Sequence, residues 1–212
     1  DLDLDEVSRV VNQIADAGFE SVAVGLLHSY LNPTHEQAIR DVLAAKLPDV
    51  SISISSEVSP QMREFERFNT VCANAYIQPL MASYLMRLKS ELIERGANCP
   101  LYLIHSGGGL VSVETAAAFP VRLVESGPAA GALAGSWFAK RLGEDRLLCF
   151  DMGGTTAKAC LIENGEPELT NTFEVARAYR FKKGSGFPVS VPASFDIEIL
   201  EVFKNGEEWL DY

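Results

Sequence analysis

Residues 147–158 read LLCFDMGGTTAK, a pattern that favours a strand, a tight turn and a second strand. The apolar residues at its start predict a β-strand that carries the carboxylate of Asp151 to its end. Small and polar residues follow at once, in the order Gly153, Gly154, Thr155 and Thr156. Glycine allows the backbone to turn tightly and to approach a ligand closely. The chain is expected to return as a second strand over residues 158–163.

The turn between these strands is a candidate phosphate site. A bound phosphate needs exposed N–H donors, no Cβ atom in the way, and a nearby carboxylate that holds a metal ion or its water. Asp151 would face Mg²⁺ or orient an attacking water, and Thr155 would donate to a phosphate oxygen. An ordinary β-hairpin turn is the alternative, since Gly-Gly and Thr are common in such turns. A P-loop is excluded, because that motif ends in Gly-Lys-Ser/Thr and leads into a helix.

A second candidate lies upstream, where residues 125–131 read ESGPAAG. A strand predicted at Val121–Val124 leads here into a helix that runs to about Leu142. Helix N-termini present free N–H groups and a partial positive charge, which suit an anion. Ser126 and Gly127 are therefore candidate anion-binding residues, and an ordinary capped helix that packs tightly on a sheet is the alternative.

A triple glycine follows the apolar strand predicted at Leu101–His105, in the sequence Ser106-Gly107-Gly108-Gly109. Gly107 and Gly108 are candidates for a flexible ligand loop, and a plain linker is the alternative. His105 beside them is either a site residue or a buried, hydrogen-bonded structural histidine.

Helices and strands alternate in the first part of the chain, which predicts an α/β layer with parallel neighbouring strands. The elements expected there are helix 5–17, strand 21–27, helix 34–47 and strand 51–55. A long helix is expected from Val71 to Gly96, with a kink or a boundary at Pro79. The remaining expectations are a short helix capped by Ser112, a hairpin turn at Asn164-Gly165, and a third antiparallel strand at 168–175.

The composition fits a folded globular protein, with 47% apolar and 22% charged residues among 212. The formal net charge of −11 argues against general nucleic-acid binding, which needs a basic face. No apolar run approaches the ~20 residues of a membrane span. Four separated cysteines predict free thiols in a reducing cytoplasm. The charged residues Arg63, Glu64, Glu66 and Arg67 are expected to form surface or inter-domain ion pairs worth little each.

Several motifs, in order along residues 6–193, resemble the hydantoinase A/5-oxoprolinase family. The motifs that carry the resemblance are LLHSYLNP at 26–33, SEVSP at 56–60, REFER at 63–67, NAY at 74–76, SGGG at 106–109, SGPAAG at 126–131, FDMGGT at 150–155 and YRFKKGSGFP at 179–188. The last of these fits the methylhydantoinase branch of the family.

The resemblance implies an actin-like, ribonuclease-H-like ATPase fold with two similar lobes. It also implies ATP and Mg²⁺ as cofactors, phosphorylation of a cyclic amide or a ketone, and a B-type partner subunit or domain. The Asp151–Thr156 turn then resembles the second of the two phosphate loops of this fold, with Asp151 as catalytic residue and metal ligand. The implied reaction is ATP-dependent opening of a hydantoin or 5-oxoproline ring, with ketone carboxylation as a variant.

Two expected parts of the family pattern are absent: the first phosphate loop near the N-terminus, and a Gly-rich stretch soon after Ala193. The start at Asp1 rather than Met points the same way, so we expect an internal fragment that is inactive when isolated. Residues 1–143 are then an α/β portion of the first lobe, 144–193 the opening strands of the second, and 194–212 a divergent acidic tail. A non-catalytic scaffold, an acetone-carboxylase-like subunit and a sugar kinase of the same superfold remain alternatives, as does a homo-oligomer.

Overall fold

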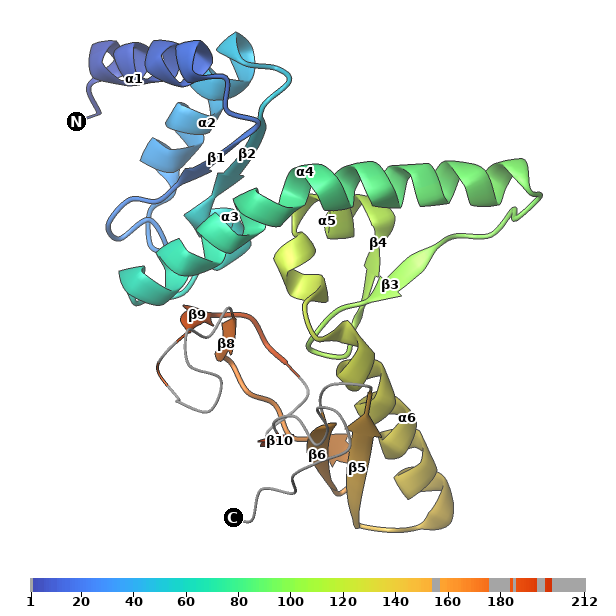
Figure 1. Cartoon of the computed structure of the whole chain (residues 1–212). Coiled ribbons are helices and arrows are strands. Elements are labelled where there is room, and N and C mark those ends of the chain that lie inside the picture. Colours follow the sequence, from blue (N-terminus) through green and yellow to red (C-terminus); the bar gives the residue numbers. More distant parts are fainter. Residues whose placement is uncertain (1, 154–156, 176–183, 185, 194–196, 200–212) are drawn as a thin grey trace, which may run out of the picture. The chain divides into compact units, whose positions relative to one another are not determined.

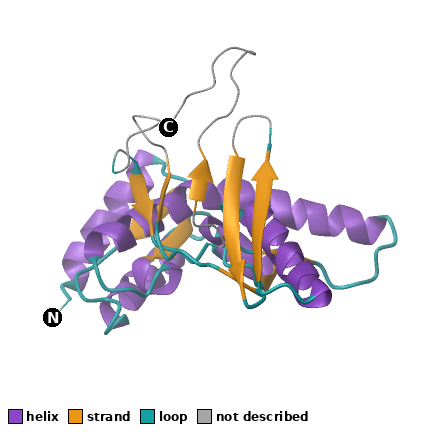
Figure 2. Ribbon diagram, turned by 90° about the horizontal axis from the view of Figure 1, so that it is seen from below, coloured by secondary structure: helices purple, strands orange, loops and turns teal. Residues whose placement is uncertain are grey.

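The computed structural model describes residues 2–153, 157–175, 184, 186–193 and 197–199. The chain divides into two compact units. The first unit comprises Asp1–Leu101, Ser112–Val121 and Phe187–Ser190, and the second comprises Tyr102–Val111, Arg122–Gly186 and Val191–Tyr212. More of the described residues lie in helices than in strands, and the strands gather in small groups (Figure 2).

The first unit opens with the predicted α/β alternation, which is confirmed. Its elements are α1 (Leu4–Ala17), β1 (Ser21–Val24), α2 (Thr34–Lys46) and β2 (Ser51–Ile54). The carboxylate of Asp3 caps α1 by accepting from the N–H groups of Asp5 and Glu6, and Gly18 ends the helix at φ 69°. Strands β1 and β2 pair in parallel, from Ser21 opposite Ser51 to Val24 opposite Ile54, and lie side by side in Figure 1.

Apolar side chains from all four of these elements form the core of this layer. Val11 of α1, Val24 of β1, Leu43 of α2 and Ile54 of β2 are buried together. The helical spacing of Val7, Val11 and Ile14 explains why one face of α1 lies on the sheet. β1 ends at Val24, earlier than the strand 21–27 that the apolar run predicts.

The rest of the first unit is built on one long helix. It contains α3 (Ser55–Val58), α4 (Glu64–Glu94), α5 (Val113–Ala118) and β9 (Phe187–Val189). Ser112 caps α5 as predicted, since its hydroxyl accepts from the N–H of Thr115. The boundary expected at Pro79 is wrong, because α4 continues through that residue. Packing explains this, as buried Val71, Ala75 and Leu85 hold the helix on both sides of the proline.

A 3₁₀ turn (η1, Pro120–Leu123) stands where a strand was expected at Val121–Val124, so that prediction is wrong. The N–H of Val121 donates to Oδ1 of Asn74 on α4 at 3.2 Å instead of to a neighbouring strand. Proline at the preceding position fixes φ near helical values, which favours the turn.

The second unit places one helix against an antiparallel sheet. Its elements are β3 (Tyr102–Ile104), β4 (Leu110–Ser112), α6 (Ser126–Leu142), β5 (Arg146–Met152), β6 (Ala157–Glu163), β7 (Glu166–Pro167), β8 (Phe173–Val175) and β10 (Ile197–Ile199). Among the described strands the sheet order is β10–β6–β5, and β7 also pairs with β6. α6 runs beside β5 and β6 (Figure 1).

The hairpin turn at Asn164-Gly165 is confirmed, with positive φ values of 52° and 76°. The continuous third strand at 168–175 is wrong, because β7 ends at Pro167 and only β8 (Phe173–Val175) is a strand within that range. Thr170 instead forms an isolated bridge with Ala193, and the two exchange backbone hydrogen bonds of 2.9 and 2.8 Å. The lobe boundary near residues 143–145 stays a prediction. Within the described residues, none of the helices combines the length and apolarity that a membrane crossing requires.

Candidate functional site

The candidate residue Asp151 lies near the end of the β5–β6 hairpin where the chain passes from β5 to β6. In the antiparallel register Asp151 lies opposite Lys158, two positions beyond the pair Cys149 and Cys160. Side chains directly opposite each other share a face, and every second residue returns to that face. Asp151 is exposed and is the last residue but one of β5. The structure therefore carries this carboxylate to the strand end, as the sequence predicts.

The helix α6 covers the same face of the hairpin. A Cβ atom added at Gly135 would lie 3.4 Å from Cβ of Cys149 and 2.7 Å from Cδ1 of Ile162. Cys149 and Ile162 therefore point at α6, and by alternation so do Asp151 and Lys158. Burial and the negative charge of Asp151 raise the pKa of the Cys149 thiol, which agrees with both groups lying on this face.

The N-terminus of α6 reaches the end of the hairpin where Asp151 lies. The ammonium of Lys158 forms an ion pair with the carboxylate of Glu125, the residue just before the helix. A Cβ atom added at Gly127 would meet nothing within 4 Å, so the first turn of α6 borders open space. Ser126 and Gly127 thus lie at the same end of the unit as Asp151.

The glycine turn itself is only partly described. Gly153 is exposed and follows β5 directly. Gly154, Thr155 and Thr156, which the sequence nominates as phosphate-binding residues, lie outside the described residues. Among the described residues, no cluster of three or more His, Cys, Asp or Glu side chains could bind a metal ion without other ligands. A single exposed carboxylate still suits Mg²⁺, which keeps several waters and takes its other ligands from substrate phosphates.

The Gly107 and Gly108 loop is a closed turn between β3 and β4. The N–H of Gly107 donates to Nδ1 of His105 at 3.0 Å, and the N–H of Gly108 donates to the carbonyl of His105 at 2.8 Å. A Cβ atom at Gly109 would come within 2.4 Å of Nε2 of His105, so the glycine makes room for the ring. These two N–H groups are engaged, and burial followed by the charge of Arg122 lowers the pKa of His105.

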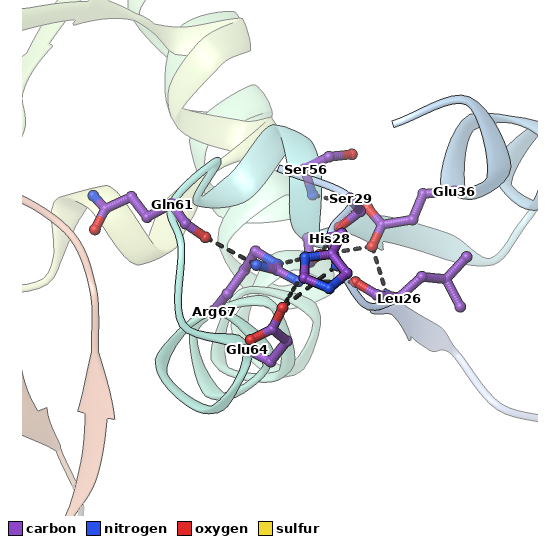
Figure 3. A network of polar contacts seen from close by, with 9 residues as sticks. Leu26, His28, Ser29, Glu36, Ser56, Gln61, Glu64 and Arg67 are labelled. Atoms are coloured by element: carbon purple, nitrogen blue, oxygen red, sulfur yellow. Dashed lines mark hydrogen bonds and ion pairs between the residues drawn. The ribbon is translucent and has the colours of Figure 1, made fainter. Parts of the chain in front are cut away.

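A second polar cluster lies in the first unit, where the sequence pointed to no site (Figure 3). The side chains of Glu36 and Arg67 are both fully buried, at 0% exposure. Oε1 of Glu36 accepts from the N–H of Leu26 at 2.8 Å and from the hydroxyl of Ser55 at 2.7 Å. Oε2 of Glu36 accepts from the N–H of Ser56 at 2.8 Å. The carboxylate therefore ties together the chain segments that leave β1 and β2.

Arg67 completes this cluster from α4. Its Nε donates to Oγ of Ser55 at 3.0 Å, and its two terminal nitrogens donate to the carbonyls of Gln61 at 2.9 Å and Leu26 at 2.8 Å. The guanidinium also lies 5.5 Å from the ring centre of Tyr30, within range of a cation–π contact. The expected ion pairs are present, since Arg63 lies 3.8 Å from Glu66 and Arg67 lies 3.7 Å from Glu64. The expected surface position is wrong for Arg67, because the strand-to-helix connections fold over it and exclude water.

The arrangement around Glu36 and Arg67 is closed, since each charged group has hydrogen-bond partners and neither meets solvent. Burial alone would raise the pKa of Glu36, but hydrogen bonds from Ser55, Ser56 and Leu26 outweigh it and hold the pKa below its usual value of 4.5. Such satisfied charged groups fix the local fold. One signal in the sequence could have indicated this: Arg67, Val71 and Asn74 share the buried face of a helix at spacings of four and three.

The family model for hydantoinase/oxoprolinase matches residues 67–199, and the model for the hydantoinase/oxoprolinase N-terminal region matches residues 1–47. The chain belongs to the hydantoinase/oxoprolinase family. An uncharacterized protein of Methanocaldococcus jannaschii is 38% identical over 99% of this chain and 31% of its own length. Most of that relative therefore lies beyond the part that this chain matches.

Two solved structures resemble this chain closely in fold. The ATP-dependent caprolactamase from Pseudomonas jessenii is 29% identical, with a TM-score of 0.72 over 92% of this chain and 27% of its own. A nucleotide-free acetone carboxylase is 24% identical, also with a TM-score of 0.72, over 89% of this chain and 26% of its own. The expected actin-like ATPase fold is thereby confirmed, and this family member spans about a quarter of each of the two solved chains.

Proposed function

We propose that this chain is part of an ATP-dependent enzyme that opens a cyclic amide of the hydantoin or 5-oxoproline type. The observation that carries the proposal is the exposed carboxylate of Asp151, at the end of β5 and on the face covered by α6. Membership of the hydantoinase/oxoprolinase family supports the reaction class, and the fold shared with an ATP-dependent caprolactamase supports the use of ATP.

The chemistry divides between the nucleotide and the residues of this chain. ATP with Mg²⁺ would supply a phosphoryl group to the amide carbonyl oxygen, where an O–P bond forms while the bond to the ADP oxygen breaks. A first water would then add to the activated carbon, and the ring C–N bond would break as the ring nitrogen takes a proton, which leaves an acyl phosphate. A second water would cleave that acyl phosphate into the carboxylate and inorganic phosphate. Asp151 would hold the metal ion with its water, and the turn after it would supply N–H and hydroxyl donors. Catalysis of this kind rests on positioning and charge neutralisation.

The other candidate residues would have different roles in the proposed site. In this proposal Gly153, Gly154, Thr155 and Thr156 would bind the phosphates, and Ser126 and Gly127 would contribute the N-terminus of α6. Gly107 and Gly108 are the least supported, since their N–H groups donate to His105. The complete enzyme would work with a B-type subunit or domain in the cytoplasm, and this part alone would not turn over substrate.

The decisive experiment replaces Asp151 by Asn in the complete protein and measures phosphate release from ATP with hydantoin, 5-oxoproline and caprolactam. Loss of a metal-holding carboxylate in the transition state is expected to lower kcat by about 100-fold or more. Asp145→Asn is the matched control, because Asp145 is an exposed carboxylate just before the other end of β5. Equal turnover of Asp151→Asn and the control would refute the assignment.

A carboxylase is the second candidate, because the acetone carboxylase matches this fold with the same TM-score as the caprolactamase. The substrate panel separates the two reactions. Phosphate release that depends on bicarbonate and a ketone, and not on a cyclic amide, would favour the carboxylase. If the complete protein neither binds Mg·ATP in calorimetry nor releases phosphate, a non-catalytic scaffold is the correct description.

A further inference from the structure

Lys158 stands out as a cation that the proposed chemistry has not yet used. It lies opposite Asp151 in the register of β5 and β6, and its side chain is 12% exposed. An ammonium group is rarely buried to this extent without a partner, because it loses its hydration. One partner here is Glu125, whose side chain is 26% exposed.

This ion pair lies at the N-terminus of α6. Glu125 is the residue before α6 and adopts a left-handed backbone with φ 69°. Lys158 therefore lies between the carboxylate of Asp151 on the neighbouring strand and the first turn of a helix of 17 residues. The helix end contributes partial positive charge, which adds to that of the ammonium.

Space for an anion lies beside this pair. The first turn of α6 is open at Gly127, where an added Cβ atom would meet nothing within 4 Å. Pro128 follows and carries no N–H, so the backbone donors of this turn belong to the residues before it. A polyphosphate bound here would meet two positive features, the ammonium and the helix end, and two carboxylates, those of Glu125 and Asp151. A divalent cation held by Asp151 would offset the charge of that carboxylate.

We infer that Lys158 is a phosphate-binding residue of this site, and that Glu125 holds its ammonium until the nucleotide takes it over. The inference rests on the proposed function, because it assumes that ATP binds beside Asp151. Lysine suits this exchange, since its ammonium is a compact charge on a flexible stem that can move between two acceptors. The carboxylate of Glu125 then competes with phosphate for the same cation.

This competition predicts opposite signs for the two partners. Lys158→Met in the complete protein is expected to raise the dissociation constant for Mg·ATP by about tenfold or more, since a charge-assisted bond is lost. Glu125→Gln removes the charge that competes with phosphate for the ammonium and is expected to leave that constant unchanged or to lower it. Lys158→Arg keeps the charge and should recover most of the affinity. Calorimetry with Mg·ATP gives the constants, and kinetics should place the Lys158→Met effect mainly in KM for ATP.

The chain offers a matched control at the other end of α6. Lys140 also pairs α6 with a strand, through Nζ to Oε1 of Glu166 on β7 at 2.7 Å, and both side chains are exposed. Lys140→Met should leave the Mg·ATP constant unchanged. If Lys158→Met behaves like Lys140→Met, the inference is wrong. If Lys158→Met and Glu125→Gln weaken Mg·ATP binding equally and lower Tm equally, the ion pair only stabilises the fold. The inference is then wrong as well.

The same set of variants separates this failure from a failure of the proposed function. If Asp151→Asn lowers turnover while Lys158→Met leaves Mg·ATP binding intact, the proposed nucleotide site is supported. Only the role of Lys158 is then refuted. If Asp151→Asn changes nothing, the site itself is wrong and the role of Lys158 falls with it.

Discussion

The two units each contain a cluster of charged side chains, and the clusters differ in their contact with water. Glu36 and Arg67 in the first unit are fully buried and hydrogen-bonded to neighbouring backbone and serine groups. Asp151 in the second unit is exposed at a strand end, beside a helix terminus that borders open space. Buried, satisfied charges stabilise a fold, whereas a carboxylate at an open edge remains available to a metal ion or a ligand.

The largest effect that would test this contrast is expected from Arg67→Met. The substitution removes the donors to Ser55, Gln61 and Leu26. It also takes away the buried cation that shares the hydroxyl of Ser55 with the buried carboxylate of Glu36. Breaking such a group typically costs about 3–5 kcal/mol of unfolding free energy. Urea unfolding of the complete protein, with amide exchange in β1 and β2 as the local probe, measures it.

Arg87→Met is the control for that experiment, because Arg87 lies on the same helix, is 66% exposed and pairs only at 3.9 Å with Glu91. Arg87→Met should change the free energy of unfolding by no more than about 0.5 kcal/mol. Equal losses for Arg67→Met and Arg87→Met would mean that burial of the cluster contributes nothing, and the contrast between the two units would fail.

Glu36→Gln is expected to lower the free energy of unfolding by about 2 kcal/mol at neutral pH. The size of this loss should depend on pH. The pKa of Glu36 is lowered in the folded protein, so its ionised form stabilises the fold above the ordinary value of 4.5. That contribution is lost as the pH falls through the folded-state pKa. The difference in unfolding free energy between the unsubstituted protein and Glu36→Gln should therefore shrink below about pH 4.5.

The exposed Glu20→Gln serves as the reference for this series, since it changes the same charge without touching the cluster. A difference between Glu36→Gln and the unsubstituted protein that stays constant from neutral to acidic pH would contradict the assigned role of the carboxylate.

The smallest effect is expected from Glu114→Gln, although Glu114 has a strongly perturbed pKa. A hydrogen bond from Lys89 lowers the pKa of Glu114 to about 2, yet both side chains are exposed at the surface. Water and salt screen such a pair, so we expect a barely measurable drop in Tm at low ionic strength and none at about 0.5 M salt. A drop as large as that of Glu36→Gln would show that burial is not what separates the clusters.

Local patterns were sufficient for much of the fold. The apolar spacing in α1 and α2, the cap at Ser112 and the turn at Asn164-Gly165 all acted through neighbours close in sequence. The strand expected at 121–124 failed because Asn74, far away in the chain, takes the N–H of Val121. The break expected at Pro79 failed because packing on both sides of the proline holds α4 together.

The sequence by itself determined the family, the strand that ends in Asp151 and the helix that begins at Ser126, because each depends on short-range spacing and on motifs in a fixed order. Only the tertiary structure decided which charges are buried. Arg67 resembles Arg63 in the sequence, yet it is fully buried while Arg63 is 80% exposed. The difference arises because the segments after β1 and β2 close over one face of α4, and Lys158 likewise meets Glu125 only through the packing of α6 on the hairpin.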